Sequence, residues 1–278
     1  MSMIDSHHHF WWHKRHPYTW PASAGDRFAR DYTPDDLRPE LQRCGIEGTV
    51  LIQVLQQAET EEFLDVCRDV DFVRGVVGWL PLADPDATAE AIERLRAHGG
   101  KLVGVRHLIA YEPDPKWLLQ DRVLESLKLL AQSKLVFDAI PINAEQFESV
   151  LAVAQRLPEL SIVMNHLGRP PIPDRGWEPW ATQVARAAEY RNITMKLSIG
   201  LDVIMRWRWN TDEVRRYSDH VLDLFGPHRT MAASNWPVIL LGASYEQCWS
   251  GITALLSNLS ANEQREVLGA TATRIYGL

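Results

Sequence analysis

The run Glu47-Gly48-Thr49-Val50-Leu51-Ile52-Gln53-Val54 (EGTVLIQV) is short, apolar and rich in β-branched residues. Such a run is typical of a strand that is buried on both faces of a parallel sheet. Seven runs of similar character accompany it along the chain: Met3–Asp5, Val73–Leu80, Leu102–His107, Leu135–Ile140, Ser161–His166, Ile193–Leu197 and Thr230–Ser234. The sequence therefore predicts eight strands.

Stretches with helical periodicity lie between these strands. Asp86–His98 is the clearest, because it begins with a capping residue and ends before Gly99-Gly100. The others are Asn143–Arg156, Trp177–Glu189, Asp212–Phe225 and a closing helix over Asn262–Tyr276. Strands that alternate with helices pair in parallel through right-handed crossovers. Eight such units predict an α/β fold, a closed (β/α)₈ TIM barrel formed by a single domain over residues 1–278.

The overall composition argues against several classes of protein. The net charge is −7 and both signs are interspersed, so no basic stripe is available for nucleic acid. Three cysteines without a CxxC pair argue against a disulfide framework and indicate a reducing, cytoplasmic setting. No apolar run approaches the ~18 residues of a membrane span, and the N-terminus lacks a signal-peptide pattern. The expected partner is a small molecule, and the sequence does not indicate an oligomeric state.

Polar residues gather where several of the predicted strands end. His7 and His9 are expected just past the first strand. The other residues of this kind are Gln53, Arg106, His107, Asp138, His166, Lys196 and Asn235. Active sites of such barrels lie at the C-terminal ends of the strands. Packing alone does not call for this distribution, so the sequence predicts a site at this end of the barrel.

The triplet His7-His8-His9 places two imidazoles on one side of an extended segment, because side chains alternate along a strand. A purification tag or a hydrated turn would also contain histidines, but three are few for a tag and the flanking residues are not linker-like. His166 closes an apolar run, where a structural histidine is also common. Together His7, His9 and His166 are candidate ligands of one divalent metal, with zinc the best match to three imidazoles. Catalysis by the same histidines without a metal is the alternative.

Arg106, His107 and Lys196 bring positive charge and hydrogen-bond donors to the same end of the barrel. An arginine can hold a carboxylate through two bonds, and a lysine can stabilise a developing oxyanion. Each of them could instead belong to a surface ion pair. Asp138, set among apolar residues, is a candidate base, hydroxyl acceptor or orienting group, and Gln53 is a candidate contact for a polar substrate.

Ordered motifs run nearly from end to end: IDSHHHFWW, PYTWP, DYTPDDLRPELQRCGIEGTVLIQ, KLVGVRHLIAYEPDP, VMNHLGRPPI, ITMKLS, SNWPV and GATATRIYGL. In these motifs the chain resembles the amidohydrolase-superfamily lactonases, which include L-fuconolactonase, L-rhamnonolactonase and 2-pyrone-4,6-dicarboxylate lactonase. The resemblance implies a barrel of amidohydrolase type that hydrolyses a sugar-acid or related lactone in carbohydrate metabolism. It also implies that His7, His9 and His166 polarise the substrate or bind a divalent metal, which some members use and others do not.

One position departs from that family. Its members typically have a general-base Asp after the last strand, whereas this chain has Asn235, which cannot accept a proton near neutral pH. Three explanations remain open. The first is an introduced Asp→Asn change, and the second is a natural enzyme with another base, such as Asp138, His107 or a metal-bound hydroxide. The third is a lactone isomerase whose nucleophile is a hydroxyl of the substrate.

Hydrolysis of a lactone is the predicted function, and the alternatives are a lactone isomerase or a catalytically silent sugar-acid binding protein. The loops Trp11–Arg30 and Asp202–Asn210 are expected to decide which lactone is bound. Within the second loop, Trp207-Arg208-Trp209 either forms an aromatic, cationic wall of the pocket or lies on the surface.

Overall fold

The computed structural model describes residues 2–16, 18–54, 59–99 and 101–278. Eight parallel strands pair in chain order: β1 Ile4–His8, β2 Gly48–Ile52, β3 Val73–Gly78, β4 Leu102–Val105, β5 Val136–Ala139, β6 Ile162–Met164, β7 Ile193–Leu197 and β8 Thr230–Ala232. Each predicted run overlaps one of these strands. The predicted (β/α)₈ barrel is therefore confirmed.

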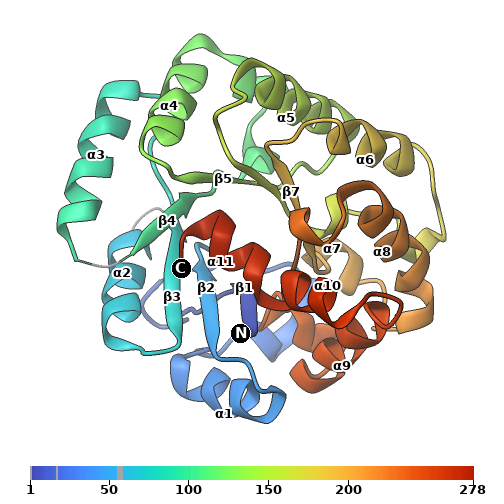
Figure 1. Ribbon diagram of the computed structural model, residues 1–278. Helices are drawn as coiled ribbons and strands as arrows, with labels where there is room; N and C mark the ends of the chain where they lie inside the picture. Colours follow the sequence, from blue (N-terminus) through green and yellow to red (C-terminus); the bar gives the residue numbers. More distant parts are fainter. Residues whose placement is uncertain (1, 17, 55–58, 100) are drawn as a thin grey trace.

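Helices surround the strands (Figure 1). They are α1 Pro34–Cys44, α2 Glu59–Asp69, α3 Pro85–Ala97, α4 Asp121–Gln132, α5 Ala144–Arg156, α6 Trp180–Ala188, α7 Leu201–Ile204, α8 Thr211–Phe225, α9 Tyr245–Leu255, α10 Ala261–Arg265 and α11 Thr271–Tyr276. All the predicted helices are confirmed, and the closing one consists of α10, a π-helical turn over Glu266–Ala270, and α11. Helices α1, α2, α4, α7 and α9 lie outside the predicted stretches, and α7 falls largely in the predicted loop Asp202–Asn210. Within the described ranges, no helix has the length and apolar character needed to cross a membrane.

The capping residues of two helices, α1 and α3, were not identified from the periodicity of the sequence. Helix α1 contains Pro39, a residue that usually marks a helix end, but a capping box between Thr33 and Asp36 stabilises its first turn. Helix α3 is capped by Asp84 and not by Asp86, since Asp84 accepts a hydrogen bond from the amide of Ala87. The predicted cap was therefore two residues late.

The sheet is nearly closed between β8 and β1. The amide of Asn235 donates to the carbonyl of His7 at 2.8 Å, and the amide of His9 donates to the carbonyl of Trp236 at 2.7 Å. These bonds bring the histidines and Asn235 together at the C-terminal end of the strands. The sequence predicted His7 just past the first strand. Strand β1 extends to His8, however, so His7 lies within it.

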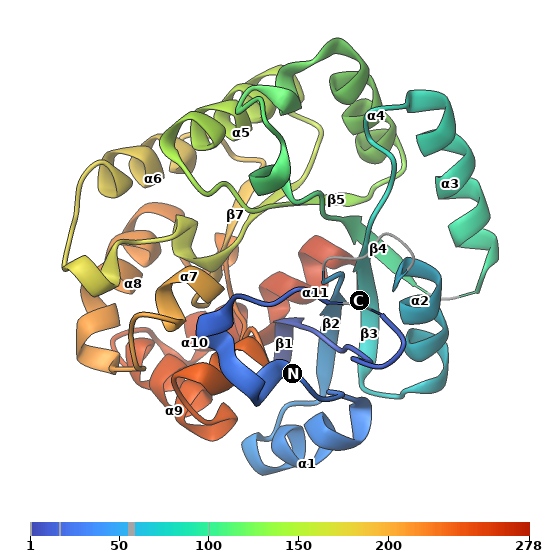
Figure 2. The same ribbon diagram turned by 180° about the vertical axis from the view of Figure 1, so that it is seen from behind.

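Opposite ends of the barrel are covered by different segments. At the N-terminal end, α11 lies across the strands (Figure 1), and its Ala272 and Tyr276 pack with interior residues such as Val50 and Val163. At the other end, the chain after β1 passes over the strand ends and includes a 3₁₀ helix over Ala22–Phe28 (Figure 2). Within the described residues, the C-terminal end is covered only by loops and short helices, and we call it the mouth of the barrel.

Candidate active site

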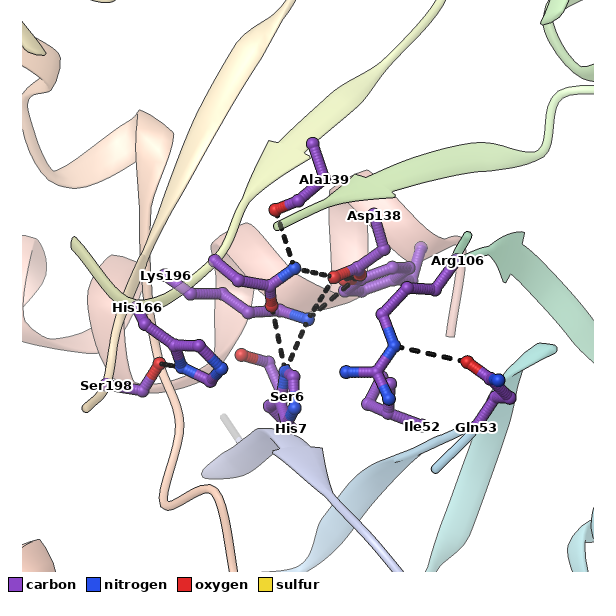
Figure 3. Close-up of polar contacts among 12 residues, drawn as sticks. Ser6, His7, Ile52, Gln53, Arg106, Asp138, Ala139, His166, Lys196 and Ser198 are labelled. Carbon is purple, nitrogen blue, oxygen red and sulfur yellow. Dashed lines mark hydrogen bonds and ion pairs between the residues drawn. The ribbon is translucent and has the colours of Figure 1, made fainter. Parts of the chain in front are cut away.

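The floor of the mouth is built around a buried ion pair (Figure 3). Lys196 on β7 places Nζ 2.9 Å from Oδ2 and 3.2 Å from Oδ1 of Asp138 on β5, and both side chains are fully buried. Asn165 and Tyr276 also donate hydrogen bonds to this carboxylate. A buried pair needs such compensation on all sides. Asp138 thus orients its neighbours from beneath the pocket.

Burial and Lys196 together determine the charge state of His7. Burial lowers the pKa of Lys196 to about 8, and the carboxylate of Asp138 opposes this shift. The ammonium is therefore mostly protonated at neutral pH, and its Nζ lies 3.3 Å from Nδ1 of His7. Burial and this cation together hold the pKa of His7 well below its usual value. The imidazole of His7 is consequently neutral.

The tautomers of His7 and His9 follow from their partners. Nδ1 of His7 lies 2.9 Å from Oδ1 of Asn165, whose amide nitrogen donates to Asp138. Nδ1 of His9 lies 2.9 Å from the carbonyl oxygen of Ile52. The nearest partner of each Nδ1 is an acceptor, and the ammonium of Lys196 lies farther from Nδ1 of His7, at 3.3 Å. We therefore place the ring proton on each Nδ1, so that each Nε2 presents a lone pair. The two Nε2 atoms face each other at 3.2 Å.

This convergence fits a divalent metal. Two lone pairs at such a distance repel unless a proton or a cation lies between them. Nitrogen ligands at ~2.05 Å from a tetrahedral zinc ion are separated by roughly 3.3 Å, close to the 3.2 Å between the two Nε2 atoms here. Burial also lowers the pKa of His9 well below its usual value. Both rings are thus in the neutral form that a metal requires.

Asn235 lies next to this pair, in the left-handed backbone conformation (φ 57°) that asparagine tolerates better than most residues. Its Nδ2 donates to the carbonyl oxygen of Ile199 at 2.8 Å. Its buried Oδ1 has no hydrogen-bond partner in the described parts of the chain. An unpartnered buried amide oxygen is costly, and binding to a metal held by His7 and His9 would satisfy it. The donor set present is therefore two imidazole nitrogens and one amide oxygen.

His166 approaches from β6, in a 3₁₀ turn where its own φ is 55°. Its Nδ1 lies 2.8 Å from Oγ of Ser198, and its ring centroid lies 4.8 Å from that of His7. Burial, assisted by the charge of Lys196, lowers the pKa of His166 well below its usual value. Among the described residues, no three His, Cys, Asp or Glu side chains converge as metal ligands would. The part of His166 as a third ligand therefore stays a prediction.

Arg106 brings the second cation to the mouth. Its Nε donates to Oε1 of Gln53 at 3.3 Å, and its Nη2 donates to the carbonyl oxygen of Val54 at 3.2 Å. Burial lowers the pKa of Arg106 to about 10, so the guanidinium is still charged at neutral pH. Gln53 thus orients Arg106, and Arg106 is the member of this pair that lines the pocket.

His107 points away from this site, although it follows Arg106 in the chain. Its ring stacks on Trp117 with centroids 4.1 Å apart, and its Nε2 lies 2.7 Å from Oε1 of Glu112. These contacts hold it within the loop that follows β4. Its position does not support the predicted role in substrate binding or as a base.

A pocket of about 230 Å³ opens above the floor. The predicted site residues that line it are His9, Arg106, His166 and Asn235. Loops form most of its wall, and both loops expected to decide specificity contribute, through Trp20 and Met205. Trp207 is buried and donates to Glu213 instead. The run Trp207-Arg208-Trp209 is not part of the wall.

Three residues at or near the pocket were not identified from the sequence. Arg169 lines the wall and forms an ion pair with Asp202, with 2.6 Å between Nη2 and Oδ2. Asn165 links His7 to Asp138, as described above. Both lie in the motif VMNHLGRPPI, which was considered only for His166.

The third such residue is Asp5, which is fully buried on β1. Its carboxylate accepts hydrogen bonds from the amide and hydroxyl of Ser234, from the amide of His7 and from the hydroxyl of Tyr245. Burial raises the pKa of Asp5 to about 6, and these hydrogen bonds oppose the shift. Asp5 thus ties the strand that carries His7 to the turn that presents Asn235.

Comparison with known proteins agrees with this geometry. The chain matches the family described as Amidohydrolase over residues 4–278. The L-fucono-1,5-lactonase of Burkholderia ambifaria is 34% identical over 98% of this chain and 94% of that protein, and that of Burkholderia multivorans is 31% identical over 99% and 96%. A crystal structure of a Burkholderia multivorans amidohydrolase with bound zinc superimposes with a TM-score of 0.90, at 30% identity over 100% of both chains. With a barrel of this kind, with His7 on its first strand and His9 directly after that strand, this chain belongs to the amidohydrolase family.

Proposed function

We propose that the protein hydrolyses a sugar-acid lactone. The observation that carries the proposal is the convergence of two neutral imidazoles, His7 and His9, at the floor of a small pocket flanked by buried cations. The relatives named L-fucono-1,5-lactonase support a sugar-acid substrate. A pocket of about 230 Å³ is of a size for a single small ring. A cytoplasmic location and a place in carbohydrate metabolism stay predictions.

The residues of the floor match the needs of ester hydrolysis. The carbonyl oxygen of the lactone gains negative charge when water adds, and the N–H groups of Arg106 can donate to it. Arg106 is fixed by Gln53 and Val54, so little reorganisation is needed when that charge appears. A divalent metal held by His7, His9 and Asn235 would supply further polarisation and lower the pKa of a bound water.

We infer that water activation does not rest on a free carboxylate of the residues that the structure describes. Asn235 has no carboxylate, and within the floor both oxygens of Asp138 are engaged by Lys196, Asn165 and Tyr276. Asp202 lines the pocket but is paired with Arg169. We therefore assign water activation to the imidazole floor or to the metal that it fits.

The direct test uses L-fucono-1,5-lactone in ¹⁸O-labelled water. Hydrolysis places one labelled oxygen in the carboxylate of the product, and this is the expected result. Interconversion of 1,4- and 1,5-lactones without label would instead identify an isomerase. Binding of the lactone in calorimetry with neither reaction would identify a silent sugar-acid binding protein.

A second test replaces Asn235 by Asp. The side-chain Nδ2 of Asn235 donates to the carbonyl oxygen of Ile199 at 2.8 Å, and a carboxylate oxygen in place of Nδ2 would face that carbonyl oxygen. We therefore expect that Asn235→Asp hydrolyses the lactone no faster than the unsubstituted protein. The unsubstituted protein should itself incorporate ¹⁸O into the product. A gain of ~10²–10⁴-fold, the usual value of a general base, would show that position 235 is the seat of a lost base.

A further inference from the structure

Tyr276 joins the closing helix to the floor of the pocket. It lies at the end of α11, which covers the N-terminal end of the barrel, and it is buried among interior residues such as Val50 and Val163. Its hydroxyl donates to Oδ2 of Asp138, and its ring centroid lies 5.4 Å from Nζ of Lys196. Burial and the charge of Asp138 raise the pKa of Tyr276 well above its usual value. The hydroxyl therefore keeps its proton and stays a donor to the carboxylate.

Asn165 connects the same carboxylate to His7. Its Nδ2 donates to Oδ1 of Asp138 and, at 3.0 Å, to the carbonyl oxygen of Ala139. Because both of these atoms are acceptors, the amide cannot be turned over without the loss of both bonds, and its Oδ1 faces Nδ1 of His7 at 2.9 Å. A relay of hydrogen bonds thus runs from the closing helix to the first strand, through Tyr276, Asp138, Asn165 and His7.

The carboxylate of Asp138 is held at both of its oxygens. Lys196 donates to both, Asn165 donates to Oδ1, and Tyr276 donates to Oδ2. Without the hydroxyl of Tyr276, Lys196 would be the remaining donor to Oδ2 among the residues that the structure describes. The carboxylate could then rotate toward the ammonium and withdraw Oδ1 from Asn165. Asn165 would in turn hold the imidazole of His7 less firmly.

We propose that Tyr276 is a positioning residue of the lactonase reaction, and that it acts through Asp138 and Asn165 on the imidazole of His7. This inference rests on the proposed function, in which His7 binds a metal or contacts the substrate. The relay keeps the ring proton on Nδ1 of His7 and directs its Nε2 toward His9. Tyr276 lies outside the pocket and far from its mouth, so it takes part in the reaction only through these other residues.

The test replaces Tyr276 by Phe, which keeps the ring and removes only the hydroxyl. Partners that orient a histidine from outside account for about 10–100-fold in metal affinity or activity. We therefore expect zinc affinity in calorimetry and kcat on L-fucono-1,5-lactone each to fall by about tenfold. KM should stay within about twofold, because the wall of the pocket is unchanged.

Tyr217→Phe is the matched control. Tyr217 is also buried, and its hydroxyl donates to the carbonyl oxygen of Gly176 at 2.8 Å, outside the relay. Its zinc affinity and kcat should equal those of the unsubstituted protein. Unchanged constants in Tyr276→Phe, or equal losses in both variants, would overturn the inference.

A double variant tests whether the effect passes through Asn165. Asn165→Leu interrupts the relay, so the addition of Tyr276→Phe to it should lower zinc affinity and kcat no further. A further tenfold loss would show that Tyr276 acts by another route, and the inference would fail.

NMR of protein labelled with ¹⁵N-histidine follows His7 without turnover or metal. The signal of its Nδ1–H group, identified by its absence from His7→Gln, should exchange with water faster in Tyr276→Phe than in Tyr217→Phe. Equal exchange in the two variants would contradict the relay. If no lactone is opened, the proposed function fails while this signal still tests the relay. If the lactone is hydrolysed and Tyr276→Phe matches the unsubstituted protein in kcat and exchange, the inference alone fails.

Discussion

The floor and the wall of the pocket are built by opposite means. The floor side chains Lys196 and Asp138 come from strands, have no exposed surface, and are joined by hydrogen bonds on every side. The wall side chains Tyr111 and Ile142 come from loops, are exposed, and are apolar. A group on a strand keeps its position because the barrel fixes it, whereas a loop can change without disturbing the barrel.

The floor and the wall are therefore suited to different functions. Chemistry needs groups held to within a fraction of an ångström, and the floor supplies them from rigid elements. Selection of a substrate needs a surface of suitable shape and polarity, and the wall supplies that. Substitutions in the floor should therefore affect stability, metal binding and kcat, and substitutions in the wall should affect KM and substrate preference.

The largest effect is expected for Asp138→Asn. It removes the charge that compensates Lys196, which is fully buried. An uncompensated buried charge costs ~3–5 kcal/mol, and the free energy of unfolding, measured with denaturant, should fall by that order. Adding Lys196→Met to this variant should recover part of the loss, because the unpaired ammonium is then gone. A double variant less stable than the single one would contradict the pairing.

The next largest effect concerns the two converging histidines. His9→Ala removes one of the facing Nε2 atoms. Loss of an indirect support of a ligand already costs about 10–100-fold in metal affinity, so zinc affinity in calorimetry should fall by more than ~100-fold. The control is His8→Ala, since the imidazole of His8 bonds to Thr49 at 2.8 Å and not to the other histidines. The folded His8→Ala protein should bind zinc with the same affinity as the unsubstituted protein.

Elemental analysis gives the outcome that would contradict this assignment. Protein purified without chelator should contain up to one divalent ion per chain. If it contains none, and neither EDTA nor added zinc changes turnover, His7 and His9 are direct substrate contacts and not ligands.

The sequence predicted the barrel well because the fold depends on local patterns. Runs such as Glu47–Val54 are apolar and short enough to be strands, and helices such as α5 repeat their apolar residues with the right spacing. Strand β1 was underestimated because its sequence, IDSHH, is mostly polar although all five residues are buried. Helix α1 was overlooked, and its Pro39 contradicts the usual pattern of a helix.

The site was predicted in part, for a physical reason. Strand ends are visible in the sequence, so His7, His9, His166 and Asn235 could be placed at one end of the barrel. Side-chain direction after a strand is not visible, and His107 turns outward to Trp117 although its neighbour Arg106 faces the pocket. Partners distant in sequence are equally hidden.

A smaller effect is expected for Asp5→Asn, which acts on the floor from outside it. The carboxylate of Asp5 accepts bonds from Ser234, His7 and Tyr245, and an amide cannot accept all of them. The turn that carries Asn235 should shift, with a loss of ~10–100-fold in zinc affinity and kcat and little change in KM. Tyr245→Phe removes one bond that does not reach the turn, and its effect should be weaker. Equal losses in both variants, or a loss confined to KM, would assign Asp5 a purely structural role.

The smallest effect is expected in the wall and separates two arginines of neighbouring loops. Arg169 lines the pocket, and the side chains of its ion pair with Asp202 are 18% and 44% exposed. Such pairs contribute ~0–1 kcal/mol to stability, so Arg169→Ala should leave the free energy of unfolding almost unchanged. If its guanidinium holds the substrate, KM should rise about tenfold, as expected for loss of one charged hydrogen bond, while kcat stays within about twofold. Arg208→Ala, next to a surface depression beside Leu240, should change neither constant. A fall in kcat for Arg169→Ala with no change in KM would mean that this loop takes part in the chemistry, and the division between floor and wall would then not hold at this position.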